Sequence, residues 1–462
     1  MADILIENGI VITMDSRRRI IKDGAVAIEG DKVIEVGKTN EVKRKHSADF
    51  RIDARQKIVM PGLIDAHVHS IQMLARGLAD DIDLIGWIHD RILPYEAAMT
   101  DKDAYVSALL CCLELIRNGT TCFADPGGYR MESVAKAIEE SGMRGIIAWA
   151  SMDMHDPERP VPPALRTTTE EALRRSEELI KKCHNMANGR IRVWTCLRVE
   201  PNVSEKLIKG INDLAKRYNV GVQMHAAVSK EQVEWVKKRT GLTVVEYLES
   251  LGVLGPHWLL IHMGWITDKE VHILKERDVK VCHVPGASLH GAYGSCSRGK
   301  FPELIKSGVT VGLGNDSSAA NNSLDMFKAM YLAATCHKEA RCDPTLISPE
   351  QALEMATVNN AKCLHWDNEI GSIEPGKKAD IIIVNIRRSN YIPIHDFSIV
   401  PNLVYSGDGH DVETVIIDGK IIMENREVKT LDEAKVLDEA QKAAERIVGE
   451  IGLNIKPRWE IQ

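Results

Sequence analysis

The chain has 462 residues, 44% of them hydrophobic, with a formal net charge of −7 at pH 7. This length is sufficient for a large apolar core, and the interspersed acids and bases argue against nucleic-acid binding. No run reaches the roughly 18 apolar residues of a membrane span, and the N-terminus lacks the features of a secretory signal. The ten cysteines include no CxxC pair, so we expect free thiols and a cytoplasmic location.

Residues 3–37 contain short apolar segments separated by turn signals at Asn8-Gly9 and Glu29-Gly30-Asp31. Such signals between apolar runs are typical of short β-strands joined by tight turns. These strands are too few to bury a face of their own, so we expect them to need a partner elsewhere in the chain.

The middle of the chain alternates β-rich apolar segments with amphipathic stretches, which predict helices at 170–187, 204–218 and 268–276 among others. Eight alternating units over about 250 residues predict an α/β fold, a closed (β/α)8 TIM barrel. The eight predicted strands are 58–66, 120–125, 145–150, 191–197, 220–225, 258–262, 279–283 and 309–316.

Residues 379–423 return to short β segments, with Asp418-Gly419-Lys420 predicted as a hairpin turn. We expect them to join the N-terminal strands in one small β-sandwich domain beside the barrel. The charged stretch 431–451 predicts a helix opened by Asp432. The predicted domains are residues 1–58 (first half of the β domain), 59–370 (barrel), 371–430 (second half of the β domain) and 431–462 (C-terminal helix and tail).

The most informative motif is His67-x-His69, which follows the first predicted barrel strand. Side chains alternate along a strand, so the two imidazoles point the same way, as a divalent cation requires. A single histidine at a strand end is more readily explained as a hydrogen-bonded core residue. Here, however, ligand-type residues end four different strands, and such barrels carry their chemistry at those ends. We therefore expect His67, His69, His225, His262 and Asp316 to meet at one mouth. A set of three histidines and one aspartate suits a zinc or iron(II) ion with an open position for water.

Several longer motifs occur in a specific order along nearly the whole chain. Together they resemble the amidohydrolase superfamily, in the branch of the S-adenosylhomocysteine/methylthioadenosine deaminases, guanine and cytosine deaminases, and s-triazine hydrolases such as atrazine chlorohydrolase. The motifs are residues 61–69 (PGLIDAHVH), 119–125 (GTTCFAD), Met224-His225, Ile261-His262, Gly314-Asn315-Asp316 and 371–380 (GSIEPGKKAD).

The resemblance implies that His67, His69, His225 and Asp316 bind the metal. It also implies that His262 orients water and substrate, and that Asp316 takes the water proton. Relatives with two metals bridge them through a modified lysine that ends the fourth strand. Because residues 190–200 contain no lysine, we expect a single ion, zinc first and iron(II) as the alternative. The implied partner is a small heterocyclic substrate, with no nucleic acid and no membrane, and we expect a homo-oligomer, either a dimer or a tetramer.

One departure from the resemblance concerns proton transfer. Deaminases of this branch typically carry a glutamate three residues after the fifth-strand histidine, whereas this chain has Val228. Valine cannot transfer a proton, and general acid–base help accelerates reactions roughly 10²–10⁴-fold. Glu96, Glu200 and Glu231 are the candidates to replace the missing acid. The other possibility is a leaving group that needs less protonation.

A second departure concerns the substrate. The branch usually reads Pro-x-Ser-Asn after the seventh strand, whereas this chain reads Pro285-Gly286-Ala287-Ser288. We therefore expect a substrate other than the common purine nucleosides. For the candidate pocket residues a packing or solvated role is at least as good an explanation as substrate contact, except at His283, which ends a predicted strand. These candidates are Trp87, His155, Arg198, His283 and His290.

Three functions remain open at this stage. The first is a metal-dependent hydrolase that deaminates a planar nitrogen heterocycle and releases ammonia. The second is a hydrolase that removes chloride or another leaving group from a triazine-like ring, or cleaves an amide-like C–N bond. The third is a non-catalytic binding protein on the same scaffold. Ammonia release separates the first two, and metal content without turnover would favour the third.

Overall fold

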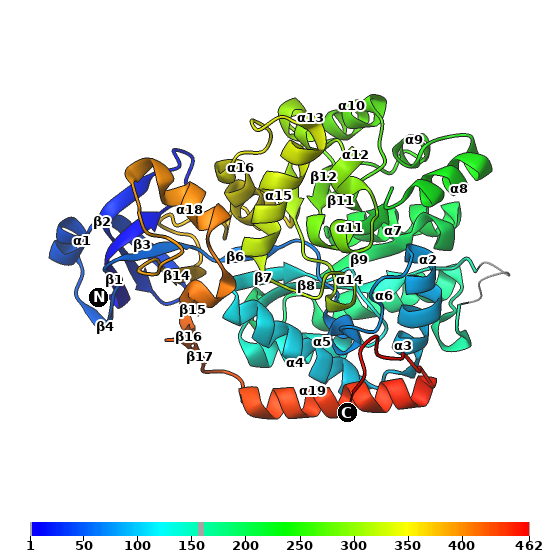
Figure 1. Cartoon of the computed structure of the whole chain (residues 1–462), viewed down its shortest axis with the longest axis horizontal. Helices are drawn as coiled ribbons and strands as arrows, with labels where there is room; N and C mark the ends of the chain where they lie inside the picture. Colours follow the sequence, from blue (N-terminus) through cyan, green and yellow to red (C-terminus); the bar gives the residue numbers. More distant parts are fainter. Residues whose placement is uncertain (1, 156–160, 462) are drawn as a thin grey trace.

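The computed structural model describes residues 2–155 and 161–461. Within these ranges, eight parallel strands follow one another around a barrel in chain order (Figure 1). Hydrogen bonds from Ala66 N to Leu313 O (3.0 Å) and from Asp316 N to His67 O (2.8 Å) link the last strand to the first, so the ring is nearly closed. The predicted α/β class and (β/α)8 TIM barrel are confirmed. The strands are β6 (Leu63–Asp65), β7 (Thr120–Ala124), β8 (Arg144–Ser151), β9 (Ile191–Val199), β10 (Val222–Ala226), β11 (Trp258–His262), β12 (Lys280–His283) and β13 (Val311–Leu313).

Helices surround the barrel and connect its strands. The predicted helices 204–218 and 268–276 are α7 and α10, and each begins at a capping hydroxyl group. The predicted helix 170–187 ends earlier, at Cys183, because His184 Nδ1 accepts a hydrogen bond from Val193 N (3.1 Å) and leaves the helical path. The helices are α2 (Leu84–Gly86), α3 (Leu93–Ala98), α4 (Asp101–Arg117), α5 (Met131–Ser141), α6 (Thr169–Cys183), α7 (Glu205–Tyr218), α8 (Lys230–Thr240), α9 (Val244–Ser250), α10 (Asp268–Glu276), α11 (Pro285–His290), α12 (Ser295–Arg298), α13 (Phe301–Ser307), α14 (Ser318–Asn321), α15 (Met326–Arg341), α16 (Pro349–Glu354) and α17 (Asn360–Cys363).

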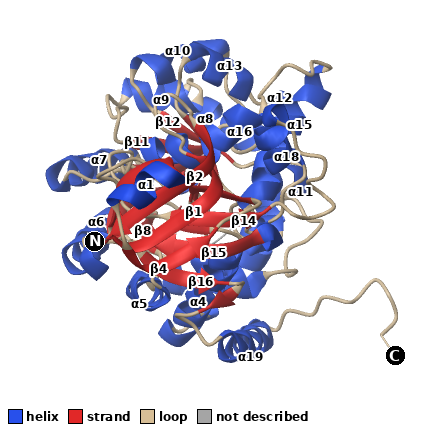
Figure 2. Cartoon of the chain, turned by 90° about the vertical axis from the view of Figure 1, so that its left-hand side faces the viewer, coloured by secondary structure: helices blue, strands red, loops and turns tan. Residues whose placement is uncertain are grey.

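Both chain ends contribute to one mixed sheet beside the barrel, which has nine strands in the part of the chain that the structure describes (Figure 2). Ile6 and Ile28 of the N-terminal strands share a buried apolar cluster with Ile383 and Ile416 of the C-terminal strands. The two ends therefore bury a common core, as in a sandwich, although hydrogen bonds join all the strands. The elements are β1 (Ala2–Ile12), β2 (Ile20–Glu29), β3 (Lys32–Lys38), α1 (Thr39–Lys45), β4 (Ala48–Asp53), β5 (Lys57–Pro61), β14 (Ile381–Asn385), α18 (Ile399–Tyr405), β15 (Val412–Ile417), β16 (Lys420–Glu424) and β17 (Glu427–Val428).

Two further local predictions were wrong. The run 58–66 is two strands, since β5 pairs with β1 and β14 in the mixed sheet and only β6 enters the barrel. Gly62 separates them at a close approach, where an added Cβ would come within 2.1 Å of the Thr121 side chain. Asn8-Gly9 is no hairpin turn, because β1 continues through it with a register shift and Asn8 takes a φ of 66°. The predicted turns at Gly30-Asp31 and Asp418-Gly419 are confirmed.

Buried Arg144, at the start of β8, ties the barrel to the mixed sheet. Its guanidinium donates to both carboxylate oxygens of Asp380 (2.8 and 3.1 Å) and to Asp418 (3.1 Å). Trp366 lies beside Arg144 and Arg192, whose guanidinium carbons are 5.5 and 4.5 Å from its ring centroid. These contacts fill the end of the barrel where the strands begin, so the opposite end remains for a ligand.

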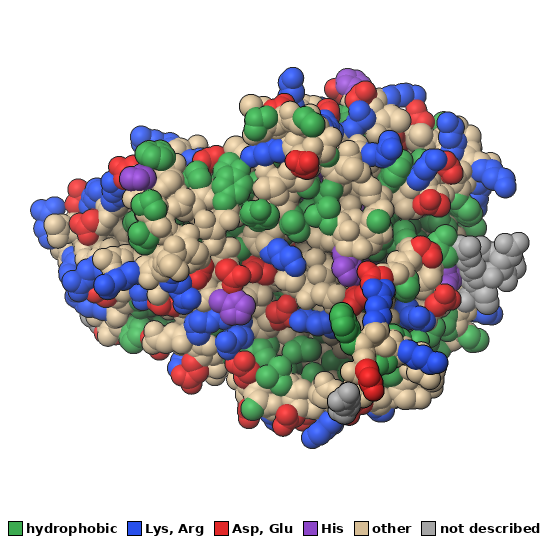
Figure 3. Space-filling model, viewed as in Figure 1, with side chains coloured by type: hydrophobic (Ala, Val, Ile, Leu, Met, Phe, Trp, Pro, Cys, Tyr) green, Lys and Arg blue, Asp and Glu red, His purple; other side chains and the backbone are tan. Residues whose placement is uncertain are grey.

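The outer surface carries mixed charge and one long helix. Helix α19 (Glu433–Ile451) runs along the outside of the barrel, and Asp432 caps it by accepting a hydrogen bond from Lys435 N (3.1 Å), as predicted. Acidic and basic side chains are interspersed on the face in Figure 3. Among the described residues, the helices are all too short or too polar to cross a lipid bilayer.

Candidate active site

The five predicted ligand-type residues meet at the end of the barrel where the strands terminate. The ring centroid of His67 lies 4.9 Å from those of His69 and His225 and 5.5 Å from that of His262. The carboxylate of Asp316 faces three of these rings, with distances from its oxygens to Nε2 of 3.6 Å (His69), 3.8 Å (His67) and 3.8 Å (His262). All five belong to one cluster, which lies at the mouth of the barrel.

The spacing of the ligand atoms fits a divalent metal ion. With Zn–N bonds near 2.0–2.1 Å, neighbouring nitrogens of a tetrahedral site lie roughly 3.3–3.4 Å apart, and His69 Nε2 is 3.2 Å from His225 Nε2. His67 is fully buried, and neither of its ring nitrogens has a hydrogen-bond partner among the described residues. Burying a polar atom without a partner destabilises the folded state. A cation bound here would supply a partner for a ring nitrogen of His67.

A left-handed backbone brings His262 into this cluster. Its predecessor Ile261 is paired in register with His225 and with Cys282, so these three side chains point to the barrel interior. Strand alternation alone would direct His262 outward. Its φ of 76° turns the ring inward instead, and Asp316 also has a positive φ, 68°. Each such conformation costs about 1–3 kcal/mol and is typical of functional sites.

Buried acids and amides that the sequence analysis left without a role fix the loops carrying the cluster. Asp65 Oδ1 accepts hydrogen bonds from His67 N and Asn315 N (3.1 Å each), and its Oδ2 accepts one from Asn315 Nδ2 (2.7 Å). Asp125 accepts from Ser70 N (2.9 Å), just after His69. Asp65, Asn315 and Asp125 all lie within the motifs of the family resemblance, which is the signal that would have found them.

His225 is oriented by the main chain. Its Nδ1 lies 2.7 Å from Arg198 O, which leaves Nε2 directed at the cluster, as in metal-binding histidines whose second nitrogen is held by a carbonyl. The Arg198 side chain is held by Glu96 through two contacts (2.8 and 3.2 Å), and Glu96 also accepts from Gln72 Nε2 (2.8 Å). Arg198 thus supports the site through its carbonyl, and its guanidinium is already paired.

Burial sets the protonation of the cluster. It lowers the pKa of His225 to about 4 and holds those of His67, His69 and His262 well below the usual range. The imidazoles are therefore neutral at pH 7, as metal ligation requires. Burial raises the pKa of Asp316 to about 7, and a neighbouring cation would lower it.

Gln232 links the position of the missing glutamate to a buried acid, Glu200. Val228 is buried, and its N–H donates to Gln232 Oε1 (2.7 Å), while Gln232 Nε2 donates to Glu200. Burial raises the pKa of Glu200 to about 8, and its Oε1 has no partner among the described residues. Of the other candidates, Glu231 is exposed on α8 and Glu96 is paired with Arg198. Of the three, Glu200 is the buried acid that no basic side chain pairs with, and its raised pKa keeps it protonated at pH 7.

Three predicted pocket residues lie on segments near the mouth. Trp87 donates from Nε1 to Ala319 O (3.0 Å), three residues beyond Asp316. His290 Nε2 lies 3.3 Å from Asp80 Oδ1, so it joins the segment after β12 to the segment after β6. His155 is partly exposed in the segment after β8. Their contact with a substrate stays a prediction.

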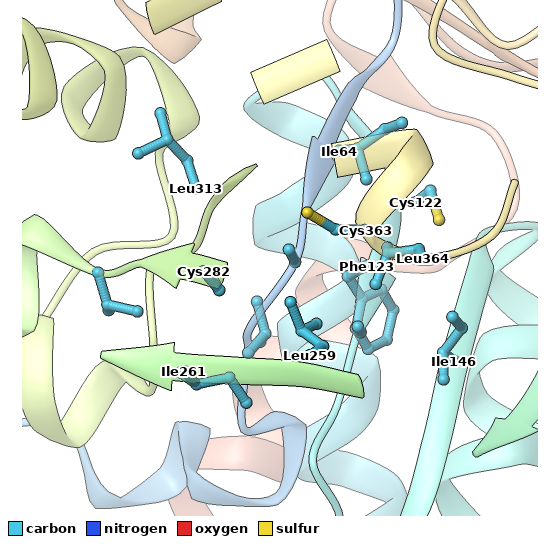
Figure 4. Packing of buried hydrophobic residues seen from close by; sticks show 14 of the residues in the cluster. Ile64, Cys122, Phe123, Ile146, Leu259, Ile261, Cys282, Leu313, Cys363 and Leu364 are labelled. Carbon is cyan, nitrogen blue, oxygen red and sulfur yellow. The ribbon is translucent and has the colours of Figure 1, made fainter. Parts of the chain in front are cut away.

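His283 does not belong to this pocket. Cys282 points into the barrel with Leu259 and Ile261 (Figure 4), so the extended strand directs His283 to the outer side. There its ring stacks on Phe301 of α13, with centroids 3.7 Å apart. We therefore withdraw His283 as a substrate contact.

The fold and the site define a class: a parallel β/α barrel with a histidine–aspartate cluster at its strand ends whose spacing suits a metal ion, the layout of metal-dependent hydrolases. The chain matches the amidohydrolase family over residues 58–422. It belongs to that family, and the prediction of an amidohydrolase that acts on C–N bonds is confirmed at this level. The hypothesis of a non-catalytic binding protein loses its support.

Two relatives are similar to this chain over nearly its whole length. It is 38% identical over 451 residues to the 5′-deoxyadenosine deaminase of Methanosarcina mazei, covering 98% of this chain and 100% of the other. It is 36% identical over 447 residues to the 5-methylthioadenosine/S-adenosylhomocysteine deaminase of Thermoanaerobacter pseudethanolicus, covering 96% and 99%.

Solved structures are similar as well. An adenosine deaminase from Xanthomonas campestris with bound zinc superimposes with a TM-score of 0.91 at 27% identity, covering 97% of this chain and 99% of the other. A triazine hydrolase from Arthrobacter aurescens gives a TM-score of 0.89 at 22% identity, covering 96% and 100%. At that identity the second likeness shows the fold alone.

Proposed function

We propose that this protein hydrolytically deaminates the aminated ring of an adenine nucleoside with an altered 5′ position, such as 5′-deoxyadenosine, and releases ammonia. The observation that carries the proposal is the strand-end cluster, in a chain 38% identical over nearly its full length to a 5′-deoxyadenosine deaminase. The departure at residues 285–288 from the usual loop sequence is the reason to test several 5′ substituents.

One divalent ion, Zn²⁺ first and Fe²⁺ as the alternative, would be held by His67, His69, His225 and Asp316. Nitrogen and oxygen donors in this number suit either metal. When bound, such an ion lowers the pKa of water toward neutrality, so that hydroxide is available at pH 7.

The protein's own residues orient the reactants and move the protons. Asp316 accepts the proton of the attacking water as its oxygen forms a bond to the ring carbon that carries the amino group. Neutral His262, 3.8 Å from Asp316, orients that water and the ring. The C–N bond then breaks, and the amino group leaves with an added proton as ammonia.

Glu200 would supply the proton that Val228 cannot. It follows β9 directly after Val199, the register partner of His225, and it is protonated at pH 7 because burial raises its pKa to about 8. Two hydrogen bonds through Gln232 connect it to the main chain at position 228. The proton is thus held close to where the family places its glutamate.

A second candidate function rests on Val228 itself. If no carboxyl group protonates the leaving group, a group that departs as an anion, such as chloride on a triazine-like ring, is the better substrate.

The test is a coupled ammonia assay with 5′-deoxyadenosine, methylthioadenosine, S-adenosylhomocysteine and adenosine, set against chloride release from a chlorinated triazine. We expect ammonia from at least one nucleoside, and loss of this activity after metal chelation and its return with zinc. Chloride release without ammonia would favour the second candidate.

A further inference from the structure

A second group of potential ligands lies behind β12. One ring nitrogen of His283 and the sulfurs of Cys296 and Cys336 all lie within 4.8 Å of one another. These residues come from β12, α12 and α15, so the group joins the barrel wall to two helices. They are separate from the strand-end cluster, which consists of histidines and an aspartate. We propose that His283, Cys296 and Cys336 form a second metal site, for a thiophilic divalent cation such as Zn²⁺.

The imidazole of His283 is arranged as a ligand would be. Its Nε2 lies 3.4 Å from Nε2 of His337, while its Nδ1 is buried and has no hydrogen-bond partner among the described residues. A metal-binding histidine characteristically has one nitrogen held by a neighbour and the other left to the metal. His283 is fully buried and stacked on Phe301, so the ring is fixed in this orientation.

The two sulfurs are close enough to share an ion. They lie within hydrogen-bonding reach of each other, and Cys296 Sγ also contacts Pro285 O at 3.6 Å. In a tetrahedral zinc site with Zn–S near 2.3 Å, two sulfurs lie about 3.8 Å apart. The observed limit of 4.8 Å therefore requires shifts of about 1 Å or less.

The charge of the two thiolates and the partial exposure of Cys336 also suit the binding of a divalent cation. Two thiolates balance the charge of a divalent cation, so the loaded site is neutral and can be buried without an unpaired charge. Cys296 is buried, but Cys336 is partly exposed. An ion can therefore enter from the Cys336 side, and water can complete a fourth position.

The site would act on the catalytic mouth through the chain segment that it anchors. Residues 284–298 run from His283 to α12 and include Tyr293, whose ring centroid is 6.2 Å from that of His262. Trp265 Nε1 donates to Tyr293 O (2.7 Å), which holds the same segment from the other side. A metal that joins His283 and Cys296 to α15 would fix Tyr293 against His262.

Cobalt substitution of the full-length protein under reducing, anaerobic conditions tests the proposal. Thiolate-to-cobalt charge transfer absorbs in the near ultraviolet, and the histidine–aspartate mouth cannot produce it. We expect the band in the wild type and in His225→Ala, and its loss in Cys296→Ser and Cys336→Ser. Cys183→Ser, at a buried cysteine on α6, and Cys342→Ser, at an exposed one, are the matched controls and should keep the band.

A second measurement uses only the wild-type chain, so it does not depend on the folding of a variant. A mercurial reagent titrated against zinc-loaded protein should release one zinc per chain, detected with a chromogenic chelator, while the mouth keeps its ion. A cobalt protein without the band, a band that persists in the double serine variant, or no zinc release would overturn the proposal. None of these outcomes bears on whether the mouth deaminates a nucleoside.

Discussion

His262 and His283 end neighbouring strands one residue beyond the register pair Ile261 and Cys282, yet they face opposite sides of the barrel wall. His262 has a φ of 76° and joins the mouth cluster, whereas His283 keeps the extended backbone of β12 and faces α13 and α15. One backbone dihedral thus separates a residue of the candidate active site from a residue of the outer layer. Histidine at a strand end is therefore an ambiguous signal until the local backbone is known.

The largest expected effect comes from removing a ligand at the mouth. His225→Ala should lose the mouth metal and reduce turnover below ~1% of the wild-type rate, because the ion is needed to ionise water at pH 7. Metal analysis in the Cys296→Ser/Cys336→Ser background counts the mouth ion alone, and we expect one per chain. His257→Ala, at the opposite end of the barrel, is the control. Two mouth ions per chain would contradict the single-metal site.

The paired histidines can be compared directly. His262→Asn should reduce kcat at least ~10²-fold while the metal is retained, since orientation of the water and the ring is lost. His283→Asn should reduce kcat far less, because Trp265 Nε1 still donates to Tyr293 O, but it should abolish the thiolate–cobalt band. Equal losses of kcat in the two variants would remove the functional distinction between the two sides of the wall.

The variant Glu200→Gln tests whether Glu200 protonates the leaving amino group. The side chains have nearly the same size, so the metal should stay while turnover falls at least ~10²-fold. A donor acts only when protonated, and burial raises the pKa of Glu200 to about 8, so the wild-type rate should decline above pH 8. This alkaline decline should be absent in Glu200→Gln. Glu231→Gln, at an exposed position, serves as the control.

The smallest effect on the native reaction is expected at Val228. Val228→Glu places a second carboxyl group near buried Glu200, so we expect no gain in native turnover and a loss of about 1–3 kcal/mol in the free energy of unfolding. Val228→Gln is the control for Val228→Glu, because glutamine has nearly the same shape as glutamate but no ionisable group. A large rise in ammonia release with Val228→Glu would show that Glu200 does not supply the proton.

Much of the fold was predictable because its signals are local. The alternation of β-rich segments and amphipathic helices gave the barrel, and Asp418-Gly419 gave a hairpin. The sequence predicts a single strand over residues 58–66, because both halves of this run are equally apolar. Only the packing of Gly62 against Thr121 and the pairing of β5 with β14 divide it. Asn8-Gly9 was misread because a bulge and a turn use the same residues.

The candidate site, like the fold, has features that the sequence predicts and features that it does not. The sequence by itself determined which residue types end which strands, and since parallel strands end together, His67, His69, His225, His262 and Asp316 had to lie near one mouth. It did not determine the direction of His283, the proton on Glu200, or the grouping of His283 with Cys296 and Cys336. These depend on a backbone dihedral, on burial, and on contacts between residues 13 to 53 positions apart. Only the tertiary structure decides them, because desolvation and side-chain direction are properties of the packed chain.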